Sequence, residues 1–271
     1  MPELPEVETL KRYLEQNIID ATITALVKRR DNIRYTLQDD LGLSVKLAKI
    51  LFIRRRAKYL LLDLDNGYSI VIHLGMTGRF TLQPKGYQAA KHDHVIFMLD
   101  NTAQLVFNDH RRFGMIYSML TSDIEEKFLQ NLGIEPLLDD MSYEYLRQKL
   151  NRNVPIKNLL MDNRIIVGIG NIYASESLFM AKILPTRLGH SLSENEINNL
   201  LLAIRHVLTK AIEAGGTTLK DFVSGDSKPG YFQQELQVYG REKRSCLACR
   251  GTIKKLKQSG RSTFYCAGCQ V

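Results

Sequence analysis

The spacing of apolar residues changes near residue 120, and this change constrains the fold more than any other feature of the sequence. Between residues 21 and 119, short β-branched and aromatic runs alternate with turn signals, which is typical of an antiparallel β-sandwich or barrel. After residue 121 the apolar residues recur every three or four positions, as in amphipathic helices. The chain has 271 residues, the length of about two domains. The sequence therefore predicts a two-domain α+β protein.

The same patterns place the individual elements. Strands are expected within residues 21–29, 44–55, 58–74, 78–82, 94–99, 103–107 and 114–120. Asp65-Asn66-Gly67 predicts a hairpin turn inside the third of these segments. Helices are expected at residues 2–19, 122–132, 142–150, 156–162, 172–183 and 193–216, and Gly215-Gly216 is typical of a helix end. We thus expect a β-sandwich domain at 1–120, a helical domain at 121–232 and a small finger at 236–271.

Composition and the first residues exclude several classes of protein. No run approaches the roughly 18 apolar residues that a membrane span requires. The first twelve residues carry three glutamates and no apolar stretch of the kind found in signal peptides. We therefore expect a cytoplasmic protein in a reducing compartment, without a membrane partner. Nothing in the sequence requires an oligomer, and we expect a monomer.

All four cysteines lie in the last 26 residues, in the pattern C-x2-C-x16-C-x2-C. Two close pairs that bracket a hairpin-length segment are typical of a four-thiolate zinc site, and a reducing compartment disfavours disulfides. The predicted ligands are Cys246, Cys249, Cys266 and Cys269. Four sulfur ligands leave no open position, so we expect one structural Zn²⁺ that holds the intervening hairpin and activates no water.

Positive charge is concentrated in the same segment. Residues 241–271 contain eight basic side chains and one acidic one, which accounts for +7 of the total formal charge of +8. A charge this local favours a polyanionic partner, most simply nucleic acid. Arg261 falls in the turn of the expected hairpin, where a guanidinium can bind a phosphate through two parallel hydrogen bonds.

Pro2 and Glu3 allow two interpretations. If Met1 is removed, the chain begins with a secondary amine that can attack a sugar aldehyde carbon, and the positive end of a helix dipole favours its unprotonated form. Glu3 would then be an adjacent general acid. On these residues alone the plainer interpretation is stronger, because proline and glutamate are both favoured in the first turn of a helix.

Nine motifs, in order along the chain, resemble those of the bacterial formamidopyrimidine-DNA glycosylases. They are MPELPEVET at 1–9, RRAKYLLL at 55–62, HLGMTGRF at 73–80, KHDH at 91–94, DHRRFG at 109–114, VGIGNIYASE at 167–176, GGTTLKDF at 215–222, KPGYFQQELQVYGR at 228–241, and the four-cysteine segment. The resemblance implies an N-terminal β-sandwich, a helix-two-turn-helix domain and a zinc finger. It also implies a DNA glycosylase and abasic-site lyase that acts on oxidised purines in duplex DNA, in a bacterial cytoplasm and associated with the nucleoid.

The resemblance also implies roles for individual residues. Pro2 would form a Schiff base with the sugar, Glu3 would protonate the ring oxygen, Lys58 would be the catalytic lysine, and Arg261 would assist the second elimination. The residues implied in DNA contact are His92, Arg111, Arg152 and Asn171. The residues implied in filling the gap left by the flipped base are Met76, Arg111 and Phe113. The residues implied in lesion recognition are Glu6, Thr217, Thr218 and Tyr231, within the segment 217–231 and the first helix.

Met76 and Phe113 also allow plainer interpretations. The small residues Gly75, Thr77 and Gly78 around Met76 predict an exposed turn, although a methionine is more often part of a core. A single aromatic residue in a β domain, such as Phe113, is usually buried. The arginine motif departs from the family at His110, where proline is usual, and this places the rigidity of the turn in question.

Two other functions remain open from the sequence. Endonuclease VIII enzymes, which remove oxidised pyrimidines, share the finger and the proline but begin Pro-Glu-Gly-Pro, whereas Leu4 follows Glu3 here. A non-catalytic protein that binds damaged DNA could keep the sandwich and the finger, but the presence of Pro2, Glu3 and Lys58 argues against it. A retained Met1 would block the amine of Pro2 in an amide.

Overall fold

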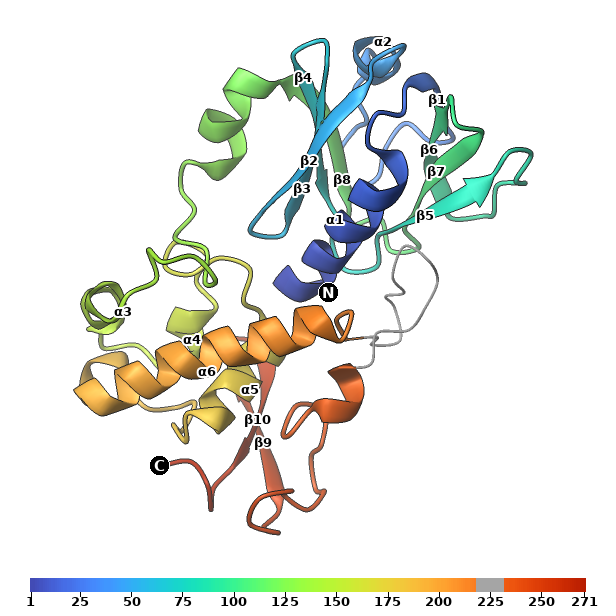
Figure 1. The fold of residues 1–271 in the computed structure, drawn as a ribbon. Helices are drawn as coiled ribbons and strands as arrows, with labels where there is room; N and C mark the ends of the chain where they lie inside the picture. The colour runs from blue at the N-terminus through green and yellow to red at the C-terminus, as the bar shows by residue number, and fades with distance from the viewer. Residues whose placement is uncertain (218–231) are drawn as a thin grey trace. The chain divides into compact units, whose positions relative to one another are not determined.

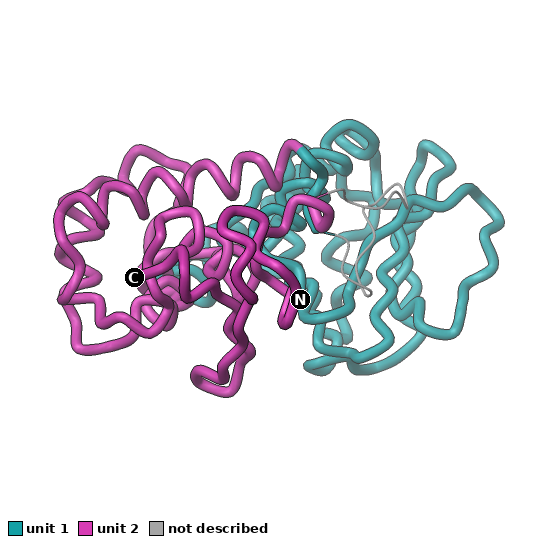
Figure 2. Tube along the Cα trace, turned by 90° about the horizontal axis from the view of Figure 1, so that it is seen from below, with its two compact units in different colours: residues 1–130, 214–231 teal, residues 131–213, 232–271 magenta. Residues whose placement is uncertain are grey.

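The computed structural model describes residues 1–217 and 232–271 (Figure 1). The chain divides into two compact units, Met1–Gln130 with Ala214–Tyr231, and Asn131–Glu213 with Phe232–Val271 (Figure 2). The first unit is therefore built from two separate stretches of sequence. In the described ranges, none of the helices has both the length and the apolar character needed to cross a membrane.

Two four-stranded antiparallel sheets form most of the first unit (Figure 1). One has the order β1-β6-β7-β5, with bounds β1 (Ile23–Lys28), β6 (Asp93–Leu99), β7 (Ala103–Asn108) and β5 (Arg79–Pro84). The other has the order β2-β3-β4-β8, with bounds β2 (Ile50–Arg56), β3 (Tyr59–Leu64), β4 (Tyr68–His73) and β8 (Met115–Leu120). Helix α1 (Leu4–Ile18) precedes both sheets in the chain.

The core of this unit draws on α1 and on both sheets. Leu10, Leu14 and Ile18 lie along one stripe of α1 and are fully buried, in one apolar cluster with Ile70 of β4 and Phe97 of β6. The helix can bury this stripe because its apolar residues recur at steps of three and four. The predicted β-sandwich with an N-terminal helix is confirmed.

One expected strand begins later than the sequence predicts. Residues 44–49 were expected in a strand, but α2 (Leu41–Val45) occupies the start of this segment and β2 begins at Ile50. Leu41 and Val45 are four positions apart and both fully buried, so a single helical turn places them on the same face. The hairpin turn at 65–67 is confirmed, with Gly67 at φ 81° between β3 and β4.

Helices dominate the second unit. They are α3 (Tyr143–Leu150), α4 (Ile156–Leu160), α5 (Asn171–Met180), α6 (Glu194–Glu213) and the 3₁₀ turns η3 (Gly189–Ser191) and η4 (Phe232–Glu235). The turn η1 (Thr121–Asp123) and the π-helical η2 (Glu125–Leu129) end the first stretch of the first unit. Helix α6 is followed by Gly215 and Gly216, both with positive φ, as the sequence predicts.

The C-terminal residues form a small finger around the hairpin of β9 (Ile253–Gln258) and β10 (Arg261–Cys266). Ser259 and Gly260 connect these strands, and both have positive φ (46° and 79°), as a two-residue type I′ turn requires. The finger has a small apolar core, in which Val238 and Ile253 pack with Cys246 and Cys266. The helices and the finger hairpin agree with the predicted fold class, whereas residues 121–130 and 214–217, which were expected in the helical domain, belong to the first unit.

Candidate functional site

The chain start and the first turn of α1 are closely packed. Pro2 and Glu3 are buried, and Glu3 is the N-cap of α1. The backbone N–H of Glu3 donates to Oε2 of Glu6 at 2.7 Å, as part of a capping box. Met1 is exposed, and as long as it is attached the nitrogen of Pro2 is an amide nitrogen. Removal of Met1 would turn it into an amine beside the positive end of α1.

Glu6 connects this helix to the second stretch of the first unit. Its buried Oε1 accepts hydrogen bonds from the backbone N–H and the hydroxyl of Thr217, both at 2.8 Å. Gly216 approaches so closely that a Cβ at this position would lie 3.1 Å from Oε1 of Glu6. The structure therefore brings Glu6 and Thr217 together. Thr218 and Tyr231, the other residues expected in lesion recognition, lie outside the described residues.

Lys58 is buried at the turn between β2 and β3, where Ala57 has a positive φ of 54°. Its positive charge acts on His73, at the end of β4. Burial, together with the charges of Lys58 and Arg34, lowers the pKa of His73 to about 4. The neutral ring accepts a hydrogen bond on Nδ1 from the backbone N–H of Gly75 at 3.0 Å. Sequence reasoning missed His73, whose only signal is its place in the HLGMTGRF motif.

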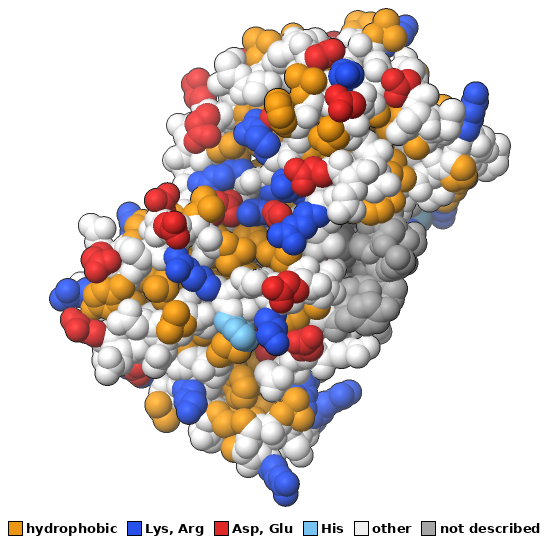
Figure 3. Space-filling view, viewed as in Figure 1, with side chains coloured by type: hydrophobic (Ala, Val, Ile, Leu, Met, Phe, Trp, Pro, Cys, Tyr) orange, Lys and Arg blue, Asp and Glu red, His pale blue; other side chains and the backbone are white. Residues whose placement is uncertain are grey.

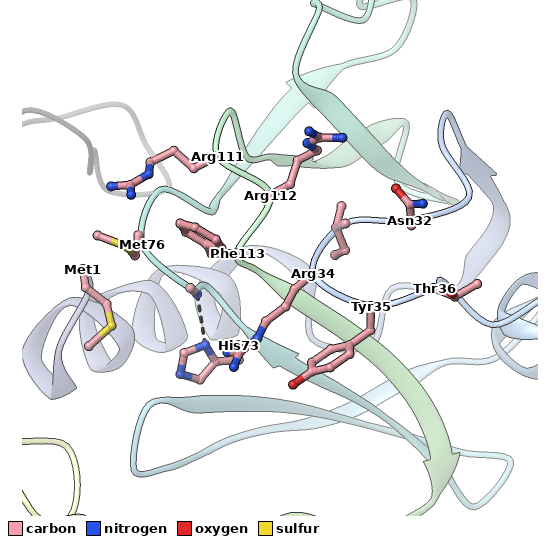
Figure 4. Close-up of a pocket in the computed structure, with 12 residues that line it drawn as sticks. Met1, Asn32, Arg34, Tyr35, Thr36, His73, Met76, Arg111, Arg112 and Phe113 are labelled. Atoms are coloured by element: carbon pink, nitrogen blue, oxygen red, sulfur yellow. Dashed lines mark hydrogen bonds between the residues drawn. The ribbon is translucent and has the colours of Figure 1, made fainter.

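A cavity of about 920 Å³ lies on the first unit (Figure 4). Met76, Arg111 and Phe113 line one side of it, and Arg34 and Tyr35 face them from the other. Phe113 is 42% exposed, so this aromatic side chain does not belong to the core. The guanidinium of Arg111 lies 5.0 Å from the centre of the Phe113 ring.

The charge of this cavity suits a polyanion. Its lining includes three arginines, Arg34, Arg111 and Arg112, and among the described lining residues there is no carboxylate side chain. Fixed positive charge on a concave wall attracts phosphate groups over several ångströms. The structure therefore gathers the three residues expected to fill a gap in DNA in one positively charged place.

The turn that carries Met76 differs from expectation. Its neighbours Gly75, Thr77 and Gly78 were expected to be exposed, but they are buried and Met76 itself is half-buried. The reason is close backbone packing: a Cβ on Gly75 would lie 2.3 Å from the carbonyl atoms of Phe113. Small residues are needed here for contact with the neighbouring loop.

His92 and His110 form an edge-to-face pair, with ring centres 6.2 Å apart. The ring centre of His94 also lies 6.4 Å from that of His92. His92 is half-buried and His110 is exposed. The residue that replaces the usual proline therefore packs against the residue expected to contact DNA.

In the second unit, Asn171 is tied to the finger hairpin. Its Nδ2 donates to the carbonyl of Ser262 at 2.8 Å, next to Arg261. The buried Nζ of Lys157 donates to Oδ1 of Asn171 at 2.5 Å and to Oγ1 of Thr263 at 2.7 Å. Sequence reasoning missed Lys157, whose only signal is a charged residue among the apolar residues Ile156, Leu159 and Leu160 of α4.

Arg152 and Arg261 are exposed in different parts of this unit. Arg152 follows α3, and its backbone carbonyl accepts from the N–H of His190 at 3.2 Å. Arg261 is the first residue of β10, directly after the turn. Within the described chain, the hydrogen bonds that join Asn171 to the hairpin do not include the side chain of Arg152.

Glu176 of α5 holds the chain that enters the finger. Its buried carboxyl accepts from the backbone N–H groups of Gln237, Val238 and Tyr239 at 2.8–3.0 Å. Burial raises the pKa of Glu176, and these three hydrogen bonds oppose that shift. This contact could not be predicted from sequence patterns, because its partners are some 60 residues away.

The four cysteine sulfur atoms lie within 4.8 Å of one another. Sγ of Cys246 is 3.8 Å from Sγ of Cys269, and Sγ of Cys249 is 3.4 Å from Sγ of Cys266. Four thiolates around a tetrahedral zinc ion are about 3.8 Å apart, given Zn–S bonds of about 2.3 Å. The predicted ligand set therefore fits one structural Zn²⁺. Exposed Lys and Arg side chains project from the finger (Figure 3).

Family models match the chain over most of its length. Residues 1–116 match the formamidopyrimidine-DNA glycosylase N-terminal domain, and residues 132–223 match the formamidopyrimidine-DNA glycosylase H2TH domain. Residues 246–271 match a zinc finger found in FPG and IleRS.

Full-length relatives and solved structures agree with these matches. Formamidopyrimidine-DNA glycosylases of Rickettsia felis and Rickettsia canadensis are 59% and 60% identical over all 271 residues, which cover 98% and 99% of those proteins. The structure of MutM (Fpg) from Thermus thermophilus is similar with a TM-score of 0.90 and 38% identity, covering 99% of this chain and 98% of that one. A complex of Lactococcus lactis Fpg with DNA containing an abasic site has a TM-score of 0.93 and 33% identity, covering 99% of each chain.

Proposed function

Because the chain belongs to the formamidopyrimidine-DNA glycosylase family, we propose that it removes oxidised purines from duplex DNA and then cleaves the strand at the abasic site. The substrates are 8-oxoguanine and formamidopyrimidines. The observation that carries the proposal is the chain start, where Pro2 directly precedes the N-cap of α1 with Glu3 and Glu6 beside it. Removal of Met1 places a secondary amine at this point. In a bacterial cell the enzyme would work on the DNA of the nucleoid.

Base removal begins with the amine of Pro2. It bonds to the sugar C1′ as the glycosidic bond breaks, and the bonding electrons leave with the damaged base. Glu3 gives a proton to the ring oxygen as the ring opens, and the amine loses its own proton, which leaves an iminium between protein and DNA. Covalent catalysis of this kind replaces one difficult displacement by two easier steps. The positive end of α1 supports the reaction because it favours the unprotonated amine.

Strand cleavage follows from the same iminium. The iminium acidifies the neighbouring sugar carbon, so loss of a proton there expels the 3′ phosphate, and a second elimination expels the 5′ phosphate. Lys58, buried at the β2–β3 turn, is the catalytic lysine in this proposal. Arg261 binds the phosphate beside the lesion and assists the second elimination. Its place directly after a type I′ turn supports this, because the hairpin fixes its backbone.

The damaged nucleotide must leave the base stack, which costs a few kcal/mol. In this proposal Met76, Arg111 and Phe113, here called the gap-filling residues, occupy the space it leaves, and Arg111 also donates to the unpaired cytosine. Their shared wall in the positively charged cavity supports this role. Further contacts with the DNA backbone come from His92, Arg111, Arg152 and Asn171.

Lesion recognition is assigned to Glu6, Thr217, Thr218 and Tyr231. The hydrogen bonds between Glu6 and Thr217 support the first two of these, because they join the start of segment 217–231 to the helix that carries the nucleophile. Glu6 is thereby in a position to link occupation of the lesion site to the geometry at Pro2.

Two alternatives make different predictions. An endonuclease VIII activity would favour oxidised pyrimidines, so excision from duplexes that carry 5-hydroxycytosine or 8-oxoguanine separates the two enzymes. A non-catalytic damage sensor would bind the duplex without reacting. The matching of both glycosylase domains and the 59% identity to named glycosylases favour the oxidised-purine enzyme.

Substitution of Pro2 tests the proposal. We expect Pro2→Gly to lose most base excision and to keep nearly the same affinity for duplex, because the change alters the nucleophile and not the DNA-binding surface. Borohydride trapping on duplex with 8-oxoguanine opposite cytosine measures the covalent step, and fluorescence anisotropy measures affinity. Pro5→Ala, at the second residue of α1, is the matched control and should still be trapped.

Two results would contradict the proposal. Equal loss of trapping and of affinity in Pro2→Gly would make Pro2 a structural residue. Mass spectrometry of fully active protein that still carries Met1 would exclude Pro2 as the nucleophile.

A further inference from the structure

The gap-filling residues stand on two segments that lie apart in the sequence. Residues 74–78 form the turn that carries Met76, and residues 109–114 form the loop that carries Arg111 and Phe113. These segments touch through their backbones, since a Cβ on Gly75 would lie 2.3 Å from the carbonyl carbon and oxygen of Phe113. No side chain fits between them, so a shift of one segment is passed to the other.

Asp109 holds the two segments together through hydrogen bonds. Its carboxyl group accepts from the hydroxyl of Thr77 in the turn, and from the backbone N–H groups of Arg111 (3.3 Å) and Gly114 (2.8 Å) in the loop. The hydroxyl oxygen of Thr77 also accepts from the N–H of Arg111 at 3.2 Å. The two segments thus share one closed set of hydrogen bonds centred on Asp109.

Asp109 is itself fixed to the neighbouring sheet. Its side chain is fully buried, its backbone N–H donates to the carbonyl of His92 at 3.0 Å, and its own carbonyl faces Nε2 of His94 at 2.7 Å. A buried carboxyl with satisfied hydrogen bonds holds its partners in a narrow range of positions, because any departure leaves polar groups unpaired.

We propose that Asp109 is a positioning residue which, with Thr77, holds the gap-filling residues as one preformed wedge. The proposal rests on the proposed function, because it concerns how these residues enter the duplex. While the hydrogen bonds of Asp109 and Thr77 are intact, Met76, Arg111 and Phe113 enter the base stack together, and no binding energy is used to assemble them. Without these hydrogen bonds, the turn and the loop move separately and Arg111 loses its fixed direction.

Single-turnover kinetics on two substrates test this. One duplex carries 8-oxoguanine, which must be flipped out of the stack, and the other carries a preformed abasic site, which has no base to remove. We expect Asp109→Asn and Thr77→Val to slow excision of 8-oxoguanine on the order of 10- to 100-fold, as a misplaced positioning group does. Borohydride trapping at the abasic site should stay close to that of the unchanged protein. With 2-aminopurine next to the lesion, both variants should give a smaller fluorescence rise on binding.

Two further variants separate positioning from general stability. Asp93 is also a buried aspartate of the first unit that accepts three hydrogen bonds, but its donors are Asn108, Tyr87 and Ala90, outside the two segments. Asp93→Asn should leave the 2-aminopurine signal unchanged, and Thr77→Ser, which keeps the hydroxyl, should restore it.

The proposal is overturned if Asp93→Asn and Asp109→Asn have equal effects, if Thr77→Ser behaves like Thr77→Val, or if both substrates slow down together. Thr77→Val keeps the size of the side chain and serves as the informative variant if Asp109→Asn does not fold. Absence of trapping in the unchanged protein would instead contradict the proposed function. The 2-aminopurine signal of Asp109→Asn does not depend on catalysis and would still test the role of Asp109.

Discussion

His73 shows how one half-buried side chain can make the first unit sensitive to acid. Its pKa of about 4 lies below the usual 6.5, so between these values the unfolded chain binds a proton that the folded chain does not. The stabilising contribution is therefore fully present above pH 6.5 and is lost as the pH falls towards 4. Between pH 7 and pH 5, titration of His73 lowers the free energy of unfolding by about 2 kcal/mol.

Substitution of His73 should remove this part of the pH dependence. In His73→Asn the side-chain oxygen can still accept from the N–H of Gly75, but it does not titrate. We expect the free energy of unfolding of the variant to fall about 2 kcal/mol less between pH 7 and pH 5 than that of the unchanged protein. Urea unfolding at the two pH values measures the difference. Equal losses in both proteins would show that His73 is not the group responsible.

At the scale of elements, the finger depends on its metal site. Its apolar cluster is built from Val238, Ile253 and two of the cysteines, with few further side chains, so the finger has little apolar core of its own. Apart from the hydrogen bonds that Lys157 and Asn171 make to the hairpin, its fold therefore depends on the ion. We expect Cys249→Ser to release zinc, unfold the hairpin and weaken DNA binding. Metal analysis and anisotropy with duplex DNA measure these effects. Leu247→Ala, an exposed change between Cys246 and Cys249, should retain one zinc per chain. A Cys249→Ser protein that binds DNA normally would contradict a role of the finger in binding.

The elements themselves could largely be predicted, because each follows from a local pattern. The stripe of Leu10, Leu14 and Ile18 defines α1, and Asp65-Asn66-Gly67 defines the β3–β4 turn. Residues 44–49 were assigned wrongly because a short helix and a buried strand both begin with closely spaced apolar residues. Burial of Leu41 and Val45 together is a tertiary fact that the pattern does not contain.

The residues of the candidate site could be predicted only where they fall in motifs. Pro2, Lys58 and Arg261 are proposed on that basis and stay predictions. Asp109, Lys157 and Glu176 were missed, since each acts through partners distant in the sequence, and only the folded chain shows those contacts. Burial of the turn around Met76 was missed for the same reason.

At the scale of the whole molecule, nearly all of the net positive charge lies in the last 31 residues. Binding of DNA should therefore weaken steeply with salt, and the finger should carry much of this dependence. We expect Arg261→Ala to lower the slope of log affinity against log salt by about one phosphate contact. Anisotropy titrations over a range of salt concentrations measure the slope. Lys85→Ala, which removes an exposed charge after β5, should change the slope less. An equal change in slope would show that the slope depends on the net charge of the protein and not on a phosphate contact of Arg261.

The hydrogen bonds between Glu6 and Thr217 have a consequence for synthesis on the ribosome. Residues 1–130 emerge first, but the first unit also needs residues from 214 onwards. At about 5–20 residues per second, the intervening 83 residues delay completion of that unit by roughly 4–17 seconds. During this interval the Glu6 carboxylate cannot yet accept its two hydrogen bonds from Thr217. The first helix of the nascent sandwich can therefore acquire all its partners only after residue 217 has been synthesised.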